Sequence, residues 1–418
     1  METEARAFVH MLTARIHPVI TEYSVAHWNL ATRGAPGDRA AVERLGAAYT
    51  RLFTDDPSEW ETICRLYTKR GAIDDELLRR SIERLYRMYA SEQVAPEHID
   101  RIAALEASLN ELYTNFRGTI AGQPVSDNQI KTILQDESDS EVRRDAWEAS
   151  KQIGATACDD VLDLVRLRNL SARALGFRDY YALALNLQEI DEAELFALLA
   201  DLETRTRAPF RQVKAEIDAR LATRCGVRID SLRPWHYDDP FFQEVPHTGT
   251  VDMDRFFAGQ DIVGLATSTY DGIGLEVRDI LARSDLFERE HKDQHAFCAH
   301  IDRATDDVRV LCNIRPDARW METILHELGH GVYDKYLADD LPLLLRYPAH
   351  SNTTEAIAML MGRLTRDADW LAMVRGLPAD GVNDLAGVAR QQERVKQLVF
   401  VRWALVMVSF ERVMPPSW

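Results

Sequence analysis

Apolar residues recur three and four positions apart along most of this chain, which is the pattern of amphipathic helices. Potential Ser and Asp caps open one of the clearest segments, and Gly176 is placed to end it. Proline and glycine gather between the segments, where helices usually stop. The pattern predicts a mainly α-helical protein. Its longest helices are expected within residues 74–93, 96–118, 138–177 and 191–227.

One region departs from the helical pattern. Residues 294–302 and 307–314 are short segments rich in Val, Ile and Phe, and they partly alternate between apolar and polar positions. The residues between them can turn the chain. We therefore expect a small β-ribbon over 294–314, which ends about a dozen residues before a histidine-containing helix.

Composition narrows the class of protein. The 418 residues carry a formal net charge of −17, which argues against nucleic acid and anionic membrane as partners, because both are bound through clustered Lys and Arg. No targeting segment is visible at the start. The apolar stretch 398–410 is too short to span a bilayer and contains Arg402, so a buried helix is expected there.

The number of cysteines indicates the redox state of the cellular compartment. Five cysteines are few and odd in number, which is typical of a reducing environment and predicts a cytoplasmic protein. Cys298 and Cys312 lie in the two predicted strands and are close enough in sequence to face each other. Two reduced core thiols are the favoured interpretation, with a pairing between them as the alternative.

The segment HELGH supplies the candidate chemistry. On a helix, His326 and His330 lie one turn apart on the same face, so both imidazoles can bind one zinc ion. Glu327 is offset by about 100° around the axis, from 3.6 residues per turn. It is thus placed beside the metal, where a carboxylate can take a proton from an attacking water.

An HExxH pattern also arises by chance on surface helices. The chance of one such match in a chain of this length and composition is about a few per cent. An apolar set on the motif helix argues against chance, because it predicts that the helix is packed. Gly329 and Gly331 each cost up to about 1 kcal/mol relative to alanine inside a helix. They are easier to explain if another element approaches the helix closely. The apolar set comprises Met321, Ile324, Leu325, Leu328 and Val332.

A catalytic zinc site needs a third protein ligand. Tyr336 stands where a third histidine of a longer motif would be. Asp334 lies on the same helix, and Asp339 and Asp340 lie in the exit from it. Glu355 opens a new helix that can pack antiparallel to the first, and we take it as the third ligand. The alternative is a capping box between Asn352 and Glu355.

These residues resemble the angiotensin-converting enzyme family of zinc peptidases, within the gluzincin group that includes thimet oligopeptidase and carboxypeptidase Taq. HELGH is followed after 24 residues by EAI, which DLPLLLR precedes. Weaker similarities at 27–34 and 174–185 extend the resemblance from about residue 20 to about 412. Its most specific part is 294–362.

The resemblance implies a two-lobed helical metallopeptidase fold with a β-ribbon beside the zinc helix. It implies that His326, His330 and Glu355 bind Zn²⁺ and that Glu327 is the general base on a zinc-bound water. His295 is similar to a substrate-contacting histidine of the family's ribbon, and a structural histidine is the alternative. The loop RPWHYDDPF is loosely similar to a loop of the family. In this chain the favoured role of its aromatic residues is to anchor the loop.

The domain arrangement follows from the same comparison. We expect a single helical peptidase unit over 1–418, with lid helices in an N-terminal part at about 1–235 and the zinc site in 236–418. The family pattern continues beyond the helix matching 389–414, so the chain is expected to be truncated at its C-terminus relative to relatives. That missing part supplies oxyanion-stabilising residues, for which Tyr347, His350 and Tyr237 are candidate replacements.

The functional prediction is a zinc-dependent metallopeptidase that hydrolyses peptide bonds in short peptides. Its partners are peptide substrates, and the sequence does not distinguish oligopeptidase, peptidyl-dipeptidase and carboxypeptidase action. The alternative is a catalytically inactive zinc-binding helical protein. A helical scaffold without metal is a third, weaker interpretation.

Overall fold

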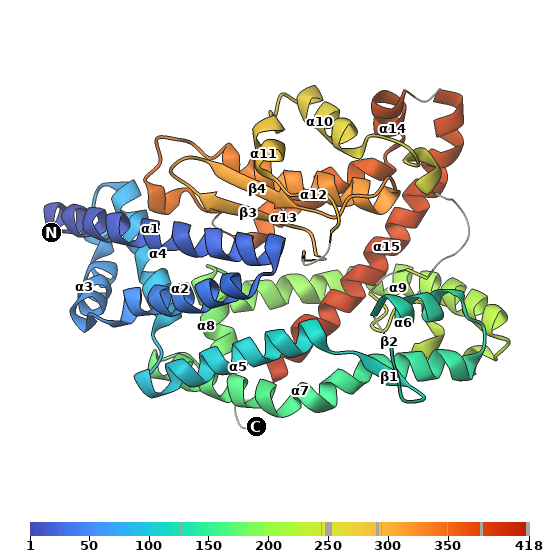
Figure 1. Ribbon diagram of the computed structural model, residues 1–418, viewed down its shortest axis with the longest axis horizontal. Helices are drawn as coiled ribbons and strands as arrows, with labels where there is room; N and C mark the ends of the chain where they lie inside the picture. The colour runs from blue at the N-terminus through green and yellow to red at the C-terminus, as the bar shows by residue number, and fades with distance from the viewer. Residues whose placement is uncertain are drawn as a thin grey trace. The chain divides into compact units, whose positions relative to one another are not determined.

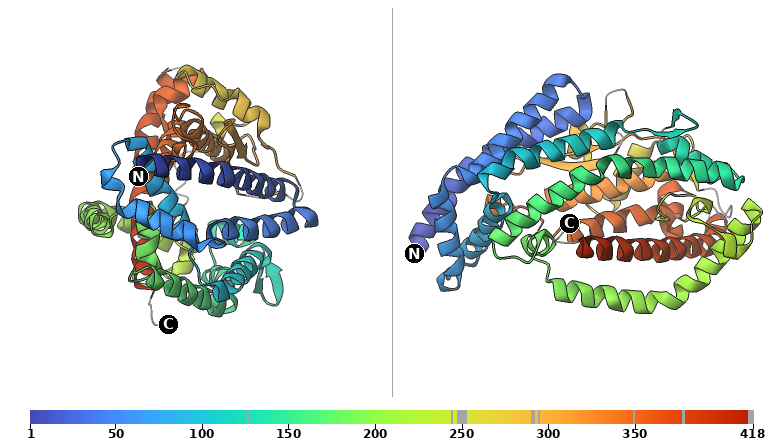
Figure 2. Two further views of the ribbon diagram at one scale, coloured as in Figure 1. Left: turned by 90° about the vertical axis from the view of Figure 1, so that its left-hand side faces the viewer. Right: turned by 90° about the horizontal axis from the view of Figure 1, so that it is seen from below.

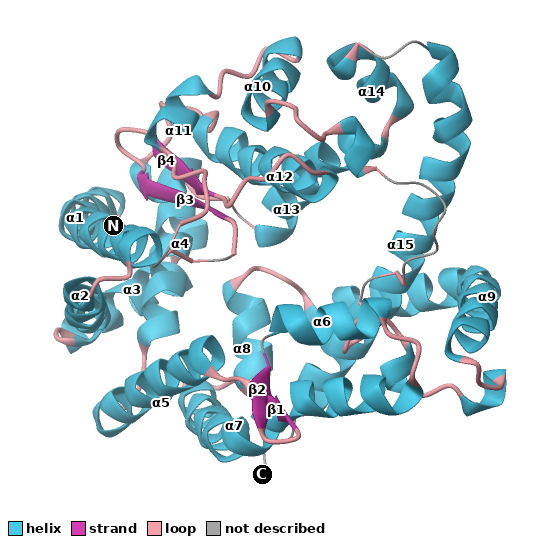
Figure 3. Ribbon diagram, turned by 45° about the vertical axis from the view of Figure 1, so that its right-hand side comes forward, coloured by secondary structure: helices cyan, strands magenta, loops and turns pink. Residues whose placement is uncertain are grey.

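The computed structural model describes most of the chain as helix. In the residues that it describes, fifteen α-helices accompany two small two-stranded antiparallel sheets (Figures 1 and 3). This confirms the prediction of a mainly α-helical fold. The described residues are 1–125, 127–243, 245–246, 253–289, 292–293, 295–348, 350–376 and 379–414.

The chain divides into two compact units, each built from two segments. Unit 1 contains residues 1–93 and 251–389, and unit 2 contains residues 94–250 and 390–418. The sequence analysis expected consecutive parts that meet near residue 235. In the structure the chain leaves unit 1 after residue 93, returns after residue 250, and passes into unit 2 again within its last helix, α15 (Ala379–Val413).

Unit 1 holds both the predicted ribbon and the HELGH helix. Its helices and strands are α1 (Glu2–Arg33), α2 (Pro36–Thr54), α3 (Pro57–Thr68), α4 (Glu76–Glu92), α10 (Ile262–Gly272), α11 (Arg278–Arg283), β3 (Phe297–Asp302), β4 (Asp307–Leu311), α12 (Ala318–Lys335), α13 (Ser351–Arg363) and α14 (Ala368–Arg375). Short 3-10 turns lie at Arg70–Ala72, Asp254–Phe256, Leu343–Leu345 and Leu364–Arg366.

The predicted β-ribbon is present as β3 and β4. They pair antiparallel with Phe297 opposite Leu311 and Cys298 opposite Val310. Gln294, the first residue of the predicted ribbon, lies outside the described residues. Cys298 therefore does not face Cys312 across the ribbon, and both are free thiols.

One face of the ribbon packs against α1, although more than 260 residues lie between the end of α1 at Arg33 and the start of β3 at Phe297. Trp28 of α1 forms a buried apolar cluster with Ile301 and Leu311. Its ring meets the Phe297 ring edge-to-face, with 6.1 Å between the centroids. Figure 1 shows α1 lying along the ribbon. This long-range packing explains why the first helices belong to the same unit as the zinc motif.

Unit 2 contains the longest helices. In two of them, α7 and α9, local cap residues account for where the helix begins or ends, as the sequence predicted. Asp139 caps α7 by accepting hydrogen bonds from the backbone N–H groups of Glu141 and Val142, and Gly226 ends α9 in the left-handed conformation at φ 63°. Figure 2 shows α5 running beside α7. The elements are α5 (Pro96–Asn115), β1 (Gly118–Ile120), β2 (Gln123–Val125), α6 (Asp127–Asp136), α7 (Ser140–Ala174), α8 (Tyr180–Leu187), α9 (Glu192–Cys225), and 3-10 turns at Ile229–Ser231 and Pro234–His236.

The apolar stretch 398–410 corrects one expectation. It lies within α15, as a helix, but only its first two residues, Leu398 and Val399, are buried. Phe400, Val406 and Phe410 are exposed and do not belong to the cluster that Leu398 and Val399 form with α9. Separately, no helix in the described residues has the length and apolarity that a membrane crossing requires.

Candidate metal centre

The HELGH helix, α12, is fixed by its cap and by a buried face. Asp317 is the N-cap residue, and its carboxylate accepts a 2.8 Å hydrogen bond from the backbone N–H of Trp320. The apolar set predicted for this helix is buried in the main core of unit 1, together with Val308 and Val310 of the ribbon. With that face held in the core, His326 and His330 project on the same side, their ring centroids 4.9 Å apart.

Helix α13 approaches α12 unusually closely, as the glycines suggested. A Cβ atom on Gly329 would lie only 2.7 Å from the Cα atom of Ala358 in α13. On the other side of the contact, a Cβ atom on Gly362 would lie 3.3 Å from the carbonyl oxygen of Glu322. The two glycines therefore let the helix backbones come together, which brings Glu355 in the first turns of α13 over the histidine face of α12.

The structure decides against the capping box. Helix α13 begins at Ser351 with His350 as its N-cap residue, and no side chain caps it. Asn352 is thus inside the helix and not at its cap. The Glu355 carboxylate instead faces the two imidazoles.

The three predicted ligands converge on one point. Nε2 of His326 lies 3.5 Å from Oε2 of Glu355, and Nε2 of His330 lies 3.6 Å from Oε1. One ligand atom from each residue can be chosen so that all three lie within 4.8 Å of one another. Two ligand atoms at about 2.0–2.1 Å from a tetrahedral zinc ion are about 3.3–3.4 Å apart. The donor set and its spacing therefore fit zinc with small adjustments.

A neighbouring hydroxyl orients one of the imidazoles. Oγ1 of Thr354 lies 2.7 Å from Nδ1 of His330, which leaves Nε2 directed toward Glu355. Such a partner on the far nitrogen fixes the ring of a metal-binding histidine. No sequence pattern predicted this role for Thr354. Its position directly before Glu355, on a helix expected to pack against the HELGH helix, is the feature that could have indicated it.

Glu327 is buried beside this ligand set and is not part of it. Burial, and secondly the negative charge of Glu355, raise the pKa of Glu327 to about 7, although the backbone N–H of Cys298 lowers it. The carboxyl group lines a pocket of about 320 Å³ with the three candidate ligands and with Cys298 of β3. The pocket therefore contains the Glu327 carboxyl group, the three candidate metal ligands and the beginning of β3.

The other predicted residues lie near the pocket with different roles. His295 is exposed, and its backbone N–H donates to Asp293; the pocket lining begins one residue later, at Ala296. Its contact with substrate stays a prediction. Asp334 lines the pocket but lies beside His300 and Arg303, outside the ligand set.

Two candidate oxyanion donors already have partners. Arg303 stacks on the ring of Tyr347, and the hydroxyl of Tyr237 in unit 2 donates to Asp218. The loop RPWHYDDPF around Tyr237 is anchored by the buried guanidinium of Arg143, which donates to the carbonyl oxygens of Trp235 and His236. The loop is thus anchored through an arginine, and the aromatic anchoring expected from the sequence stays a prediction.

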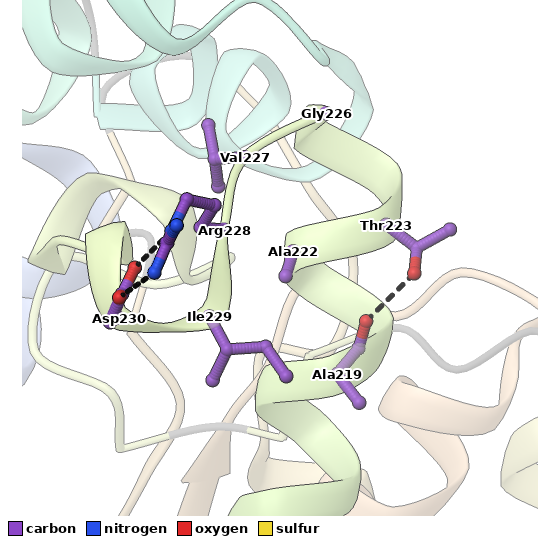
Figure 4. A pocket seen from close by; sticks show the side chains of 8 residues that line it. All are labelled: Ala219, Ala222, Thr223, Gly226, Val227, Arg228, Ile229 and Asp230. Carbon is purple, nitrogen blue, oxygen red and sulfur yellow. Dashed lines mark hydrogen bonds and ion pairs between the residues drawn. The ribbon is translucent and has the colours of Figure 1, made fainter.

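A larger hollow of about 800 Å³ lies in unit 2 at the C-terminal end of α9 (Figure 4). Its two charged lining residues, Arg228 and Asp230, bond to each other. The described lining offers no histidine, cysteine or second carboxylate for catalysis or metal binding. The smaller pocket in unit 1 is therefore the candidate active site.

Comparison with known proteins concerns a different part of the chain. Residues 1–227, more than half of the sequence, match the family described as angiotensin-converting enzyme. The match precedes the HELGH motif, so it is independent of the metal-centre residues. No curated protein matches the chain. The chain belongs to the angiotensin-converting enzyme family of peptidases.

Proposed function

We propose that the protein is a zinc-dependent peptidase that hydrolyses peptide bonds in short peptides, with Glu327 as the general base. Family membership supports a metallopeptidase-type activity. The observation that carries the finer proposal is the convergence of His326, His330 and Glu355, with Glu327 buried at their side.

The ligand set favours a catalytic metal over a structural one. Structural zinc sites are usually closed by four protein ligands, whereas catalytic sites use three and keep a position open. Among the described residues three ligands come together here. A zinc ion held by them would supply a Lewis acid that polarises the scissile carbonyl and makes water more acidic.

Glu327 is suited to move a proton. Its carboxylate accepts the proton of the attacking water and later gives it to the leaving amine. A pKa near neutrality favours both steps, and burial is the main cause of the raised pKa of Glu327 in the metal-free protein. A bound cation would lower that pKa, because it stabilises the carboxylate.

The ribbon supplies a surface for the peptide. Ala296, Phe297 and Cys298 line the pocket at the start of β3, whose pairing within the described residues is with β4 alone. An extended peptide can add to the other edge of β3, so that its backbone hydrogen bonds align the scissile bond beside the metal ligands.

The alternative proposal is a zinc-binding protein without peptidase activity. It is favoured by the engagement of Tyr347, whose ring centroid lies 3.9 Å from the guanidinium carbon of Arg303. This contact holds the ring of Tyr347, and the site lacks one oxyanion donor if the held hydroxyl does not reach the reacting carbonyl. Loss of one oxyanion donor lowers the rate by about 10²–10³.

Metal analysis and a peptide assay separate these proposals. We expect about one zinc per chain, and His330→Ala is expected to lose most of it, while substitution of the exposed His10 by Ala retains it. The zinc-loaded chain is then incubated with a mixed peptide library. Cleavage that a chelator abolishes supports the peptidase, and stoichiometric zinc without cleavage supports the inactive alternative. Equal metal content in the unsubstituted chain and His330→Ala contradicts both.

A further inference from the structure

A group of cationic side chains adjoins the metal pocket, where β3 turns into β4. The guanidinium carbon of Arg303 lies 3.9 Å from the centroid of the Tyr347 ring, and that of Arg84 in α4 lies 4.8 Å from the same centroid. His300 of β3 contacts Arg303. We call Arg84, His300, Arg303 and Tyr347 the arginine cluster.

Two contacts connect this cluster to the pocket. Asp334, which lines the pocket, lies 3.4 Å from Nη1 of Arg303. Tyr347 directly precedes Pro348, another residue of the lining. The cluster therefore adjoins the pocket through Asp334 and Pro348, its own four members lie behind the lining residues, and all of them belong to unit 1.

The charges of the cluster do not balance. Asp334 compensates Arg303, which also donates to the carbonyl oxygen of Arg346 at 2.7 Å. The Nε–H of Arg84 is buried and donates to no described atom. The strongest charged and titratable neighbours of Arg84 are Tyr347, Tyr49, Arg303 and Arg80, none of which is a carboxylate. Because largely enclosed charges are normally paired, Arg84 stands out as a cation without a carboxylate partner among the described residues.

His300 provides a second donor without an acceptor. Its side chain is 2% exposed, and its Nδ1 lies 2.8 Å from Nη1 of Arg303. Nδ1 also lies 3.5 Å from Oδ2 of Asp334; because arginine only donates and the Arg303 contact is the shorter of the two, we assign Nδ1 as the acceptor and the ring proton to Nε2. Nε2 is buried and has no partner among the described residues. Two unsatisfied donors in one cluster indicate that an acceptor from outside the chain belongs there.

The position of the cluster along β3 suggests which acceptor this is. Cys298 lines the metal pocket, and His300 follows two residues later, about 6.6 Å along a strand. A peptide aligned on the edge of β3 would therefore bring a residue two or three positions from its scissile bond to the cluster. A carboxylate is the group of a peptide that accepts paired hydrogen bonds from guanidinium donors.

We infer that the arginine cluster is a subsite for a carboxylate of the peptide substrate, which makes the site selective for acidic peptides. The inference rests on the proposed peptidase function. The carboxylate is that of an Asp or Glu side chain of the peptide. Arg84 binds it, Arg303 and Tyr347 position Arg84, and His300 donates through Nε2.

Binding to a variant that cannot turn over tests the subsite. Zinc-loaded Glu327→Gln protein is titrated calorimetrically with matched short peptides that carry Glu or Gln at successive positions, each with a free or an amidated C-terminus. We expect one Glu peptide to bind about tenfold more tightly than its Gln twin, with either form of the C-terminus, as a charge-assisted pair implies. Which pair differs identifies the peptide position that the subsite contacts.

Substitutions then locate the effect. Adding Arg84→Gln is expected to reduce the preference to below about twofold, and Arg84→Lys, which keeps the charge, is expected to retain part of it. Arg6→Gln is the control, because it removes an equal charge at a side chain that is 59% exposed. The control should keep the full preference.

The outcomes separate the subsite from the proposed function. Equal affinity for every Glu and Gln pair overturns the subsite, even if the unsubstituted chain cleaves peptides. A preference that survives Arg84→Gln also overturns it. A preference that depends on Arg84 supports the subsite, even if the unsubstituted chain cleaves nothing and the peptidase proposal fails.

Discussion

A side chain on Gly329 would collide with Ala358, since a Cβ atom there would lie 2.7 Å from the Ala358 Cα atom. This contact sets the distance between α12 and α13, and therefore the distance between the two histidines and Glu355. Metal binding by this chain thus depends on a glycine that is not itself a ligand.

Gly329→Ala is expected to push the two helices apart. The overpacking costs about 1–3 kcal/mol, which exceeds the helix-propensity gain of up to about 1 kcal/mol. We expect a lower free energy of unfolding in urea and weaker zinc binding. Gly154→Ala in α7 is the matched control, because nothing lies within 4 Å of a Cβ atom there. It should stabilise the protein slightly, and equal stabilisation by both substitutions would contradict the packing argument.

Thr354→Val should weaken zinc binding and keep the fold. The substitution removes the hydroxyl that holds Nδ1 of His330, and loss of such a partner typically costs 10–100-fold in metal affinity or activity, so we expect about that range. Competition with a chromogenic chelator measures the change. Thr353→Val, at an exposed position of the same helix, should leave the affinity unchanged. The orienting role is wrong if the two variants bind zinc alike.

Glu327→Gln is expected to separate metal binding from catalysis. The amide has nearly the same shape but does not accept the proton, so cleavage should fall by about 10²–10⁴-fold. Zinc content should remain that of the unsubstituted chain, because Glu327 is outside the ligand set. Undiminished cleavage of the best library peptide would exclude Glu327 as the base.

The pKa of Glu327 predicts how the stability of the metal-free protein depends on pH. Because that pKa rises from an ordinary 4.5 to about 7 on folding, the folded chain retains a proton that the unfolded chain has lost between these values. This contribution to stability is complete below about pH 4.5 and is lost as the pH rises through about 7. In the metal-free state, Glu327→Gln should therefore be more stable than the unsubstituted chain at about pH 8, by up to about 3 kcal/mol.

Urea unfolding of chelator-treated proteins at about pH 4.5 and about pH 8 checks this expectation. Comparing the variant with the unsubstituted chain at each pH removes the contribution of the other titrating groups. The stability difference between the two proteins should grow with pH. A difference of the same size at both pH values would show that burial does not raise the pKa of Glu327 as stated.

The sequence predicted those parts of the structure that depend on local chemistry. The cap at Asp139 and the stop at Gly226 follow from the residues within one helical turn. The convergence of Glu355 with the histidines was accessible because helical spacing and a short connection limit where the next helix can lie. These inferences needed little knowledge of distant contacts.

The remaining features depend on partners that are far apart in sequence. Arg84 meets Tyr347 only because α4 packs beside the segment after α12, and no pattern around either residue indicates it. The stretch 398–410 could be predicted as a helix from its apolar residues. Its sequence did not indicate which of these residues would be buried by other helices. The packing of α1 on the ribbon is another such long-range contact, because it joins distant segments of the sequence within unit 1.

The contact of Trp28 with Ile301 and Leu311 has a consequence for biosynthesis. A chain made from its N-terminus places α1 outside the ribosome long before the ribbon that covers Trp28 has been translated. Contacts of such large sequence separation are slow to form, and exposed apolar surface invites aggregation while they are missing. The first helices are therefore expected to need chaperone protection until translation has passed residue 311.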